Sequence, residues 1–280
     1  MSLQTAFGII LITIVPSITL IYLRITYIFM RFKRYRQLES FQIMIQVGLL
    51  DCAAAPGAVS VGLVHLLNTE NIQTANALVA VFIVVGKVDG FLYVLLALNR
   101  LKVIVGLRYP TILHTFIIVF AWTYGIALMV VFVVPSCGIL VRPGMFLPFV
   151  DKSLSHVELT FRASGYVYQG TLCVSFLIYV IIVAYISWTE RKITTSSSVT
   201  KWNILAYAII KFVIDMGLFI PSRYVDMSDP TNAFVLVLLN IAKLFVVPPV
   251  LYLALFRSAR ADFFGRSQLR ISHIAVQQLS

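Results

Sequence analysis

Seven apolar stretches, each long enough to cross a lipid bilayer as a helix, alternate with shorter polar segments along this chain. A membrane-spanning helix needs about 20 predominantly apolar residues. The stretches that meet this requirement cover residues 6–30, 41–67, 76–101, 113–135, 163–188, 203–224 and 232–256. They are much longer than the alternating strands of an outer-membrane β-barrel. The sequence therefore predicts an all-α membrane protein built as a seven-transmembrane helix bundle.

Composition supports a membrane protein and argues against other classes. Hydrophobic residues make up 60% of the chain and charged residues 12%, and the mean hydropathy is +0.95, outside the range of soluble domains. The net charge of +11 does not indicate nucleic-acid binding, because the basic residues cluster in short segments between the apolar stretches. Residues 1–5 lack the basic segment of a cleavable signal peptide.

The cysteines and histidines of the chain are not spaced as in catalytic or metal-binding sites. The three cysteines, Cys52, Cys137 and Cys173, have no metal-ligand spacing, so neither a metal site nor a disulfide scaffold is expected. The four histidines are scattered, without an i,i+4 pair, at His65, His114, His156 and His273. No catalytic triad or phosphate-binding loop is visible either. The sequence predicts a protein that is not an enzyme and carries no cofactor.

Lysine and arginine are unevenly divided between the connecting segments, and the positive-inside rule assigns the richer set to the cytoplasm. The richer set holds 14 basic residues, namely Arg31, Lys33, Arg34, Arg36, Arg100, Lys102, Arg108, Arg191, Lys192, Lys201, Arg257, Arg260, Arg266 and Arg270. The other set holds 4, namely Arg142, Lys152, Arg162 and Arg223. The N-terminus is therefore expected outside and the C-terminus inside. Residues 1–256 would form the bundle and 257–280 a cytoplasmic tail.

The start of this tail mixes aromatic and basic residues in the sequence FRSARADFFGR. This pattern predicts a short amphipathic helix on the inner leaflet. Arg24, near the inner end of the first stretch, is expected to extend its charge towards the headgroups. The outer segment 136–162 is long enough to fold over the mouth of the bundle.

Charged residues inside the apolar stretches mark a candidate site, because burying a charge at membrane depth is costly. Asp89 and Arg100 are 11 residues apart, which places them within about 20° of one helix face and about 16 Å apart. Lys243 lies at a depth comparable to that of Asp51, and we expect it to pair with Asp51, Asp89 or both. Asn240 is included in this buried polar network. The alternative is that these pairs only fix the helix register.

The sixth apolar stretch carries two further charges. Lys211 and Asp215 are four residues apart and can pair along one helix face. Alternatively, Asp215 contacts a ligand, because this stretch continues outward through Pro221, which can bend a helix.

Motifs at the inner ends of two stretches resemble those of G-protein-coupled receptors. In that family an acid–Arg pair closes span 3 and an Asn-Pro-x-x-Tyr motif closes span 7; Asn99-Arg100 and Pro249-Val250-Leu251-Tyr252 stand at these places. The resemblance implies a switch role in G-protein coupling for Asn99, Arg100, Pro249 and Tyr252. More narrowly, IVPSITLIYL, FQIMIQVGLLD and LLALNR are similar to nematode serpentine chemoreceptors of the Srg superfamily, class V among them.

The chain also departs from the receptor pattern. Asn99 replaces the acid before Arg100, and Pro248 replaces the Asn before Pro249. The start of the sixth stretch offers no acid to hold Arg100, and Glu190 is the nearest replacement. The third stretch has no cysteine at its outer end, which leaves Cys137 without the partner that the resemblance implies.

A ligand pocket is expected in the outer half of the bundle, where several aromatic residues and one acid lie. The candidates are Phe91, Tyr93, Tyr166, Tyr168, Asp215 and Phe219. For any single aromatic residue among them, packing or anchoring at the membrane interface is the alternative role.

The resemblance implies a chemosensory receptor that transmits binding of an extracellular small molecule to a heterotrimeric G protein. Its partners would be membrane lipid, that G protein and the ligand, with no nucleic acid. It would lie in the plasma membrane, in a sensory cilium if it is chemosensory. Two alternatives stay open. A transporter or channel would use the buried Lys and Asp residues as an ion or proton path. A retinal protein would use Lys243, which lies six residues before Pro249 rather than the seven found in opsins.

Overall fold

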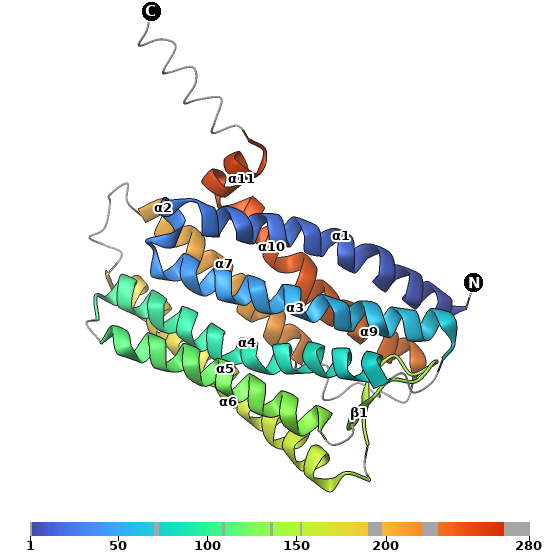
Figure 1. Cartoon of the computed structure of the whole chain (residues 1–280). Coiled ribbons are helices and arrows are strands. Elements are labelled where there is room, and N and C mark those ends of the chain that lie inside the picture. Colours follow the sequence, from blue (N-terminus) through green and yellow to red (C-terminus); the bar gives the residue numbers. More distant parts are fainter. Residues whose placement is uncertain are drawn as a thin grey trace, which may run out of the picture.

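Long helices arranged as a bundle make up most of the computed structural model (Figure 1). The structure describes residues 2–69, 73–107, 110–134, 137–151, 153–189, 198–219 and 229–265. The long helices in these ranges are α1 (Leu3–Arg31), α3 (Glu39–Leu67), α4 (Gln73–Val105), α5 (Thr111–Val133), α6 (Ser155–Thr189) and α7 (Ser198–Phe219).

The last apolar stretch is helical but not uniform. It consists of α9 (Pro230–Ile241), a π-helical turn η2 (Ala242–Val246) and α10 (Val247–Leu255). Asp229 caps the start of α9 by accepting from the amide of Thr231, and Pro230 follows at the first helical position, where its missing N–H is not needed. Pro248 and Pro249 cannot donate back along the helix, which favours the irregular turn just before them.

Six helices in the described ranges are long and apolar enough to cross a membrane: α1, α3, α4, α5, α6 and the combined α9–α10 stretch. The protein is therefore an integral membrane protein. Helix α7 has 22 residues, a sufficient length, but it is not among these six. The seventh crossing and the orientation in the membrane remain predictions.

Two short helices lie at one end of the bundle and a β-hairpin lies at the other (Figure 1). The helices are α2 (Lys33–Arg36) and α11 (Arg257–Phe263), and the antiparallel hairpin pairs β1 (Ile139–Leu140) with β2 (Phe149–Val150). The beginning of α1 lies at the hairpin end. If the positive-inside assignment holds, the hairpin covers the outer mouth and α11 lies on the inner face.

Helix α11 is held against α2 by polar contacts. Arg34 and Tyr35 both donate to the carboxylate of Asp262, and the Tyr35 hydroxyl does so at 2.8 Å. Burial raises the pKa of Tyr35 to about 12, so this phenol stays a donor at neutral pH. Arg24 donates to the carbonyl of Phe263 at 2.6 Å, and its guanidinium lies 4.6 Å from the centre of that ring. Arg24 therefore anchors α11, whereas the sequence predicted only that its charge extends to the headgroups.

Helices α1, α3 and α4 pack most closely. A Cβ at Gly8 would lie 2.9 Å from the carbonyl oxygen of Gly62, and one at Gly57 would collide with the carbonyl oxygen of Leu78. Glycine at these positions lets the backbones approach each other, as is common in membrane bundles. By contrast, α7 touches its neighbours at only a few places in the described part of the chain.

Candidate functional site

Five charged side chains lie in the middle of the bundle, four of them buried and Lys243 partly buried. Asp51 comes from α3, Asp89 from α4, Lys211 and Asp215 from α7, and Lys243 from η2. At most 3% of Asp51, Asp89, Lys211 or Asp215 is exposed. The helices that carry these residues are distant in sequence, so the fold creates a single interior cluster of charges.

Lys243 pairs with Asp215. Its ammonium lies 3.1 Å from Oδ1 of Asp215 and also donates to the hydroxyl of Tyr168 at 3.4 Å. The expected pairing of Lys243 with Asp51 or Asp89 is therefore wrong. The prediction used only the depth of each residue along its helix, and depth does not fix the rotation of one helix about its axis relative to another.

Lys211 reaches across the bundle to Asp51, with Nζ 3.8 Å from Oδ2. Its ammonium also lies 4.9 Å from the centre of the Tyr93 ring. The predicted ion pair between Lys211 and Asp215 does not form in this structure, because each residue pairs with a different neighbouring helix. Two buried ion pairs thus connect α7 to the rest of the bundle.

The carboxyl groups of Asp51 and Asp89 are close enough to interact electrostatically. Tyr22 donates its hydroxyl to Asp51 at 2.9 Å, and Tyr93 donates to Asp89 at 3.1 Å. Asn240 does not take part, since its amide donates to the carbonyl of Leu236 within α9. A tyrosine hydroxyl thus holds each of these two buried carboxyl groups.

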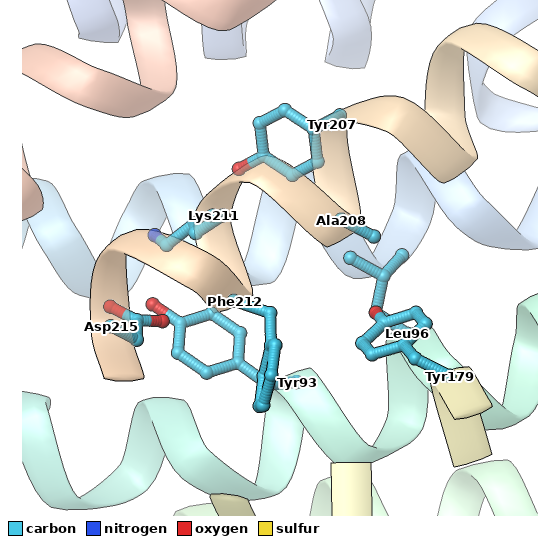
Figure 2. A pocket seen from close by; sticks show the side chains of 8 residues that line it. All are labelled: Tyr93, Leu96, Tyr179, Tyr207, Ala208, Lys211, Phe212 and Asp215. Carbon is cyan, nitrogen blue, oxygen red and sulfur yellow. The ribbon is translucent and has the colours of Figure 1, made fainter. Parts of the chain in front are cut away.

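A cavity lies beside this cluster, between α4, α6 and α7 (Figure 2). It is lined by Tyr93, Leu96, Tyr179, Tyr207, Ala208, Lys211, Phe212 and Asp215. The volume open to the centre of a water molecule is about 10 Å³, close to the minimum for one ordered water. Among the described residues, Lys211 has only its 3.8 Å ion pair with Asp51 as a polar contact, and Oδ2 of Asp215 accepts no hydrogen bond. The cavity thus places polar groups where a water molecule or a small polar ligand group can bind.

The proposed switch residues lie at the inner end of the bundle. Asn99 and Arg100 are buried, and Arg100 donates to the side-chain oxygen of Asn99 at 2.7 Å. Tyr252 is buried one turn after Pro249, and Tyr207 of α7 donates its hydroxyl to that of Tyr252 at 3.1 Å. Glu190, the suggested partner of Arg100, lies outside the described residues.

Sequence reasoning missed Glu39, at the first position of α3. Its carboxylate accepts from the side-chain amide of Asn99 at 2.9 Å and from Lys102 at 2.9 Å. The signal in the sequence was weak. Glu39 is an acid just before the second apolar stretch, and position 99, before Arg100, holds Asn in place of an acid.

The candidate pocket residues divide into two groups. Tyr93, Tyr168 and Asp215 face the charged interior. Phe91 instead packs against α5, with ring centres 5.2 Å from Phe120, and 69% of Tyr166 is exposed on the outside of α6. Neither Phe91 nor Tyr166 lines the interior cavity. The side chain of Phe219 lies outside the described part of the structure.

The hairpin loop, residues 137–151, packs an aromatic residue, Phe146, into the end of the bundle opposite α11; Phe146 and its contacts are called the aromatic plug. Phe146 is 4% exposed and its ring centre lies 5.0 Å from Phe7, 5.5 Å from His65 and 5.5 Å from Phe234. The hairpin is held in addition by the amide of Val141, which donates to the side chain of Asn76 at 3.1 Å. The loop thus packs against the ends of α1, α3, α4 and α9 that lie opposite α11.

The arrangement of helices matches a known structure. The sequence matches no protein-family model and no curated protein. The crystal structure of squid rhodopsin, however, superposes with a TM-score of 0.68 over 94% of this chain and 86% of the squid protein, at 11% sequence identity. This chain has a rhodopsin-like fold. At that identity the similarity establishes the arrangement of the helices, and the function has to be argued from the residues of this chain.

Proposed function

We propose that this chain is a G-protein-coupled receptor that transmits the binding of an extracellular small molecule to a heterotrimeric G protein. Within that class, the sequence motifs favour a nematode-type chemosensory receptor of the plasma membrane or a sensory cilium. The ligand would bind between the outer hairpin and the charged cluster, near Tyr168 and Asp215. The coupling surface would lie at the opposite end, around Arg100.

One observation carries this proposal: α7 packs lightly in its described part, yet two buried ion pairs tie it to α3 and η2. Breaking a buried ion pair costs about 3–5 kcal/mol when one charge is left unpaired. The cost falls if a new partner is at hand. Lys211 and Asp215 are four residues apart on α7 and can pair with each other once they leave their present partners.

A ligand can use this exchange of partners. A cationic or hydrogen-bonding group that binds Asp215 competes with Lys243 and weakens the contact between α7 and η2. Lys211 can then leave Asp51 and pair with Asp215 on its own helix. The ligand needs only to bind this second arrangement more tightly than the first.

The inner end provides the response. Tyr207 of α7 contacts Tyr252 of α10, so a shift of α7 separates two rings that are now stacked 4.9 Å apart. That separation would loosen the packing around Arg100, which is 1% exposed. An exposed Arg100 among the basic residues of the inner segments would then offer a contact to the G protein.

Nucleotide exchange on purified G proteins tests the proposal directly. The receptor would be placed in lipid nanodiscs with a panel of heterotrimeric G proteins, and a library of small organic molecules would be screened for accelerated exchange. We expect Lys243→Met, which frees Asp215 to pair with Lys211, to raise exchange without ligand several-fold, and Arg100→Ala to remove both basal and stimulated exchange. Exchange rates equal to those of empty nanodiscs for every variant and ligand would refute the proposal.

Two other functions make opposite predictions. An ion or proton path is favoured by the same buried acids and lysines and would give ion flux in proteoliposomes without any G protein. A retinal protein would need Lys243 to be released from Asp215 and would develop a visible absorbance band when retinal is added. Neither signal is expected from a G-protein-coupled receptor that binds a diffusible ligand.

A further inference from the structure

The inner end of α4 lacks an acid beside Arg100, but a carboxylate from another helix lies one side chain away. Glu39, at the start of α3, accepts from Nδ2 of Asn99 at 2.9 Å. The same carboxylate accepts from Nζ of Lys102 at 2.9 Å and 3.0 Å through its two oxygens. Nδ1 of His114 lies 3.9 Å from it. Glu39 therefore accepts hydrogen bonds from both Asn99 and Lys102, which define the position of its carboxylate.

The contact with Glu39 orients the amide of Asn99. A carboxylate can only accept, so the amide must turn its NH₂ group towards Glu39 and its oxygen away. That oxygen accepts from Oγ of Ser40 at 2.7 Å and from a guanidinium nitrogen of Arg100 at 2.7 Å. Asn99 is fully buried, so no water competes for these bonds.

We propose that Glu39 is a positioning residue that holds Arg100 in its buried state through Asn99. In this relay the negative charge remains on Glu39 at the half-exposed start of α3. Asn99 carries no charge, and its oriented side-chain oxygen accepts from Arg100. The proposal rests on the coupling role proposed above for Arg100. It also explains how a receptor can keep a buried Arg100 with asparagine at position 99.

The relay predicts an unusual response to substitution. In Asn99→Asp, which introduces the acid common in this family, two carboxylates would face each other at the distance of a hydrogen bond. In Glu39→Gln, the side chain at position 39 can turn its own NH₂ group towards Asn99, and the amide of Asn99 is then free to turn round. Each single change removes the fixed orientation, whereas the double variant reverses donor and acceptor and restores one hydrogen bond between the two positions.

Reactivity of Arg100 towards phenylglyoxal, mapped by mass spectrometry, measures its burial without any G protein. The full-length protein in nanodiscs should protect Arg100. We expect labelling to increase at least threefold in Glu39→Gln and in Asn99→Asp, and to return to within twofold of the unmodified protein in the double variant. Glu158→Gln is the matched control, because Glu158 contacts Arg162 on the exposed surface of α6 and should leave labelling unchanged.

Basal nucleotide exchange on G protein, without ligand, provides the functional readout of the same four variants. The relay predicts that exchange follows Arg100 labelling: higher in both single variants and restored in the double variant. Labelling that is unchanged in the single variants, or that rises further in the double variant, would overturn the relay. If Arg100 labelling follows the predicted pattern but no variant supports exchange, the relay stands and the proposed coupling function fails.

Discussion

The ammonium of Lys243 lies 3.1 Å from the carboxylate of Asp215, joining a π-helical turn to α7, a helix that touches its neighbours at few places in its described part. Asp215 is 1% exposed, and Lys243 is the cation that lies within ion-pair distance of its carboxylate in the described part of the chain. A buried pair of this kind adds little net stability compared with an apolar pair, but it strongly opposes the loss of one member. It therefore specifies where α7 sits at little cost to the total stability.

Replacing Lys243 alone should destabilise the protein. Lys243→Met leaves Asp215 without its nearest cation, and we expect a loss of about 3 kcal/mol or more. Lys243→Met combined with Asp215→Asn should recover most of that loss, because no uncompensated charge remains. Thermal unfolding in detergent, followed by tryptophan fluorescence, measures both variants. Arg162→Met is the surface control, since exposed ion pairs contribute only about 0–1 kcal/mol. Equal losses in the single and double variants would contradict this account.

Glycine at position 57 should be required by the contact between α3 and α4. In Gly57→Ala the added methyl group meets the backbone carbonyl of Leu78, which cannot move without shifting α4. We expect a destabilisation of about 1–3 kcal/mol, seen as a lower melting temperature. Gly86→Ala on α4 is the matched control because its Cβ would meet nothing within 4 Å. That change should be neutral or stabilising by up to about 1 kcal/mol, from helix propensity.

Phe146 should hold the outer loop closed. Phe146→Ala removes a ring packed among Phe7, His65 and Phe234, and large core truncations of this type cost about 3–5 kcal/mol. We expect faster hydrogen exchange in residues 137–151 and faster cleavage there by an added protease. Met145→Ala tests the neighbouring position, where 52% of the side chain is exposed, and should leave both rates unchanged. Similar exchange rates for the two variants would show that the plug does not hold the loop.

The attachment of α11 should depend on pH at the alkaline end. Burial raises the pKa of Tyr35 from 10.0 to about 12. Because the folded state favours the neutral phenol, the stability from this group is fully present below pH 10 and is lost as the pH rises through about 12. A pair of spin labels on α11 and α1 would report the separation. Tyr35→Phe should abolish this pH dependence, while Asp262→Ala should release α11 already at neutral pH.

Much of the fold follows from one-dimensional information. The apolar stretches predicted the long helices to within a few residues at most ends, although α6 begins eight residues earlier than expected, at Ser155. Helical periodicity placed Asp89 and Arg100 on one face, and both are buried in the structure. These properties depend only on hydropathy and on the pitch of a helix, which the sequence carries directly.

The pairing of charges could not be predicted in the same way. Depth along the membrane suggested Asp51 or Asp89 for Lys243, but the choice among three buried acids depends on the rotation of each helix about its axis. The π-helical turn at Ala242–Val246 changes that rotation locally at Lys243 itself. Glu39 was overlooked for a related reason: its contact with Asn99 joins residues 60 positions apart, and no periodic pattern links them.

The glycine contacts that join α1, α3 and α4 have a consequence for how such sequences diverge. Any side chain at Gly8, Gly57 or Gly62 would crowd the neighbouring helix, so selection should keep glycine at these positions whatever the chain binds. Gly170 of α6 and Gly217 of α7 are exposed, and an added Cβ at either position would meet nothing within 4 Å. Substitutions should therefore accumulate at these exposed glycines, while the glycines between α1, α3 and α4 are retained.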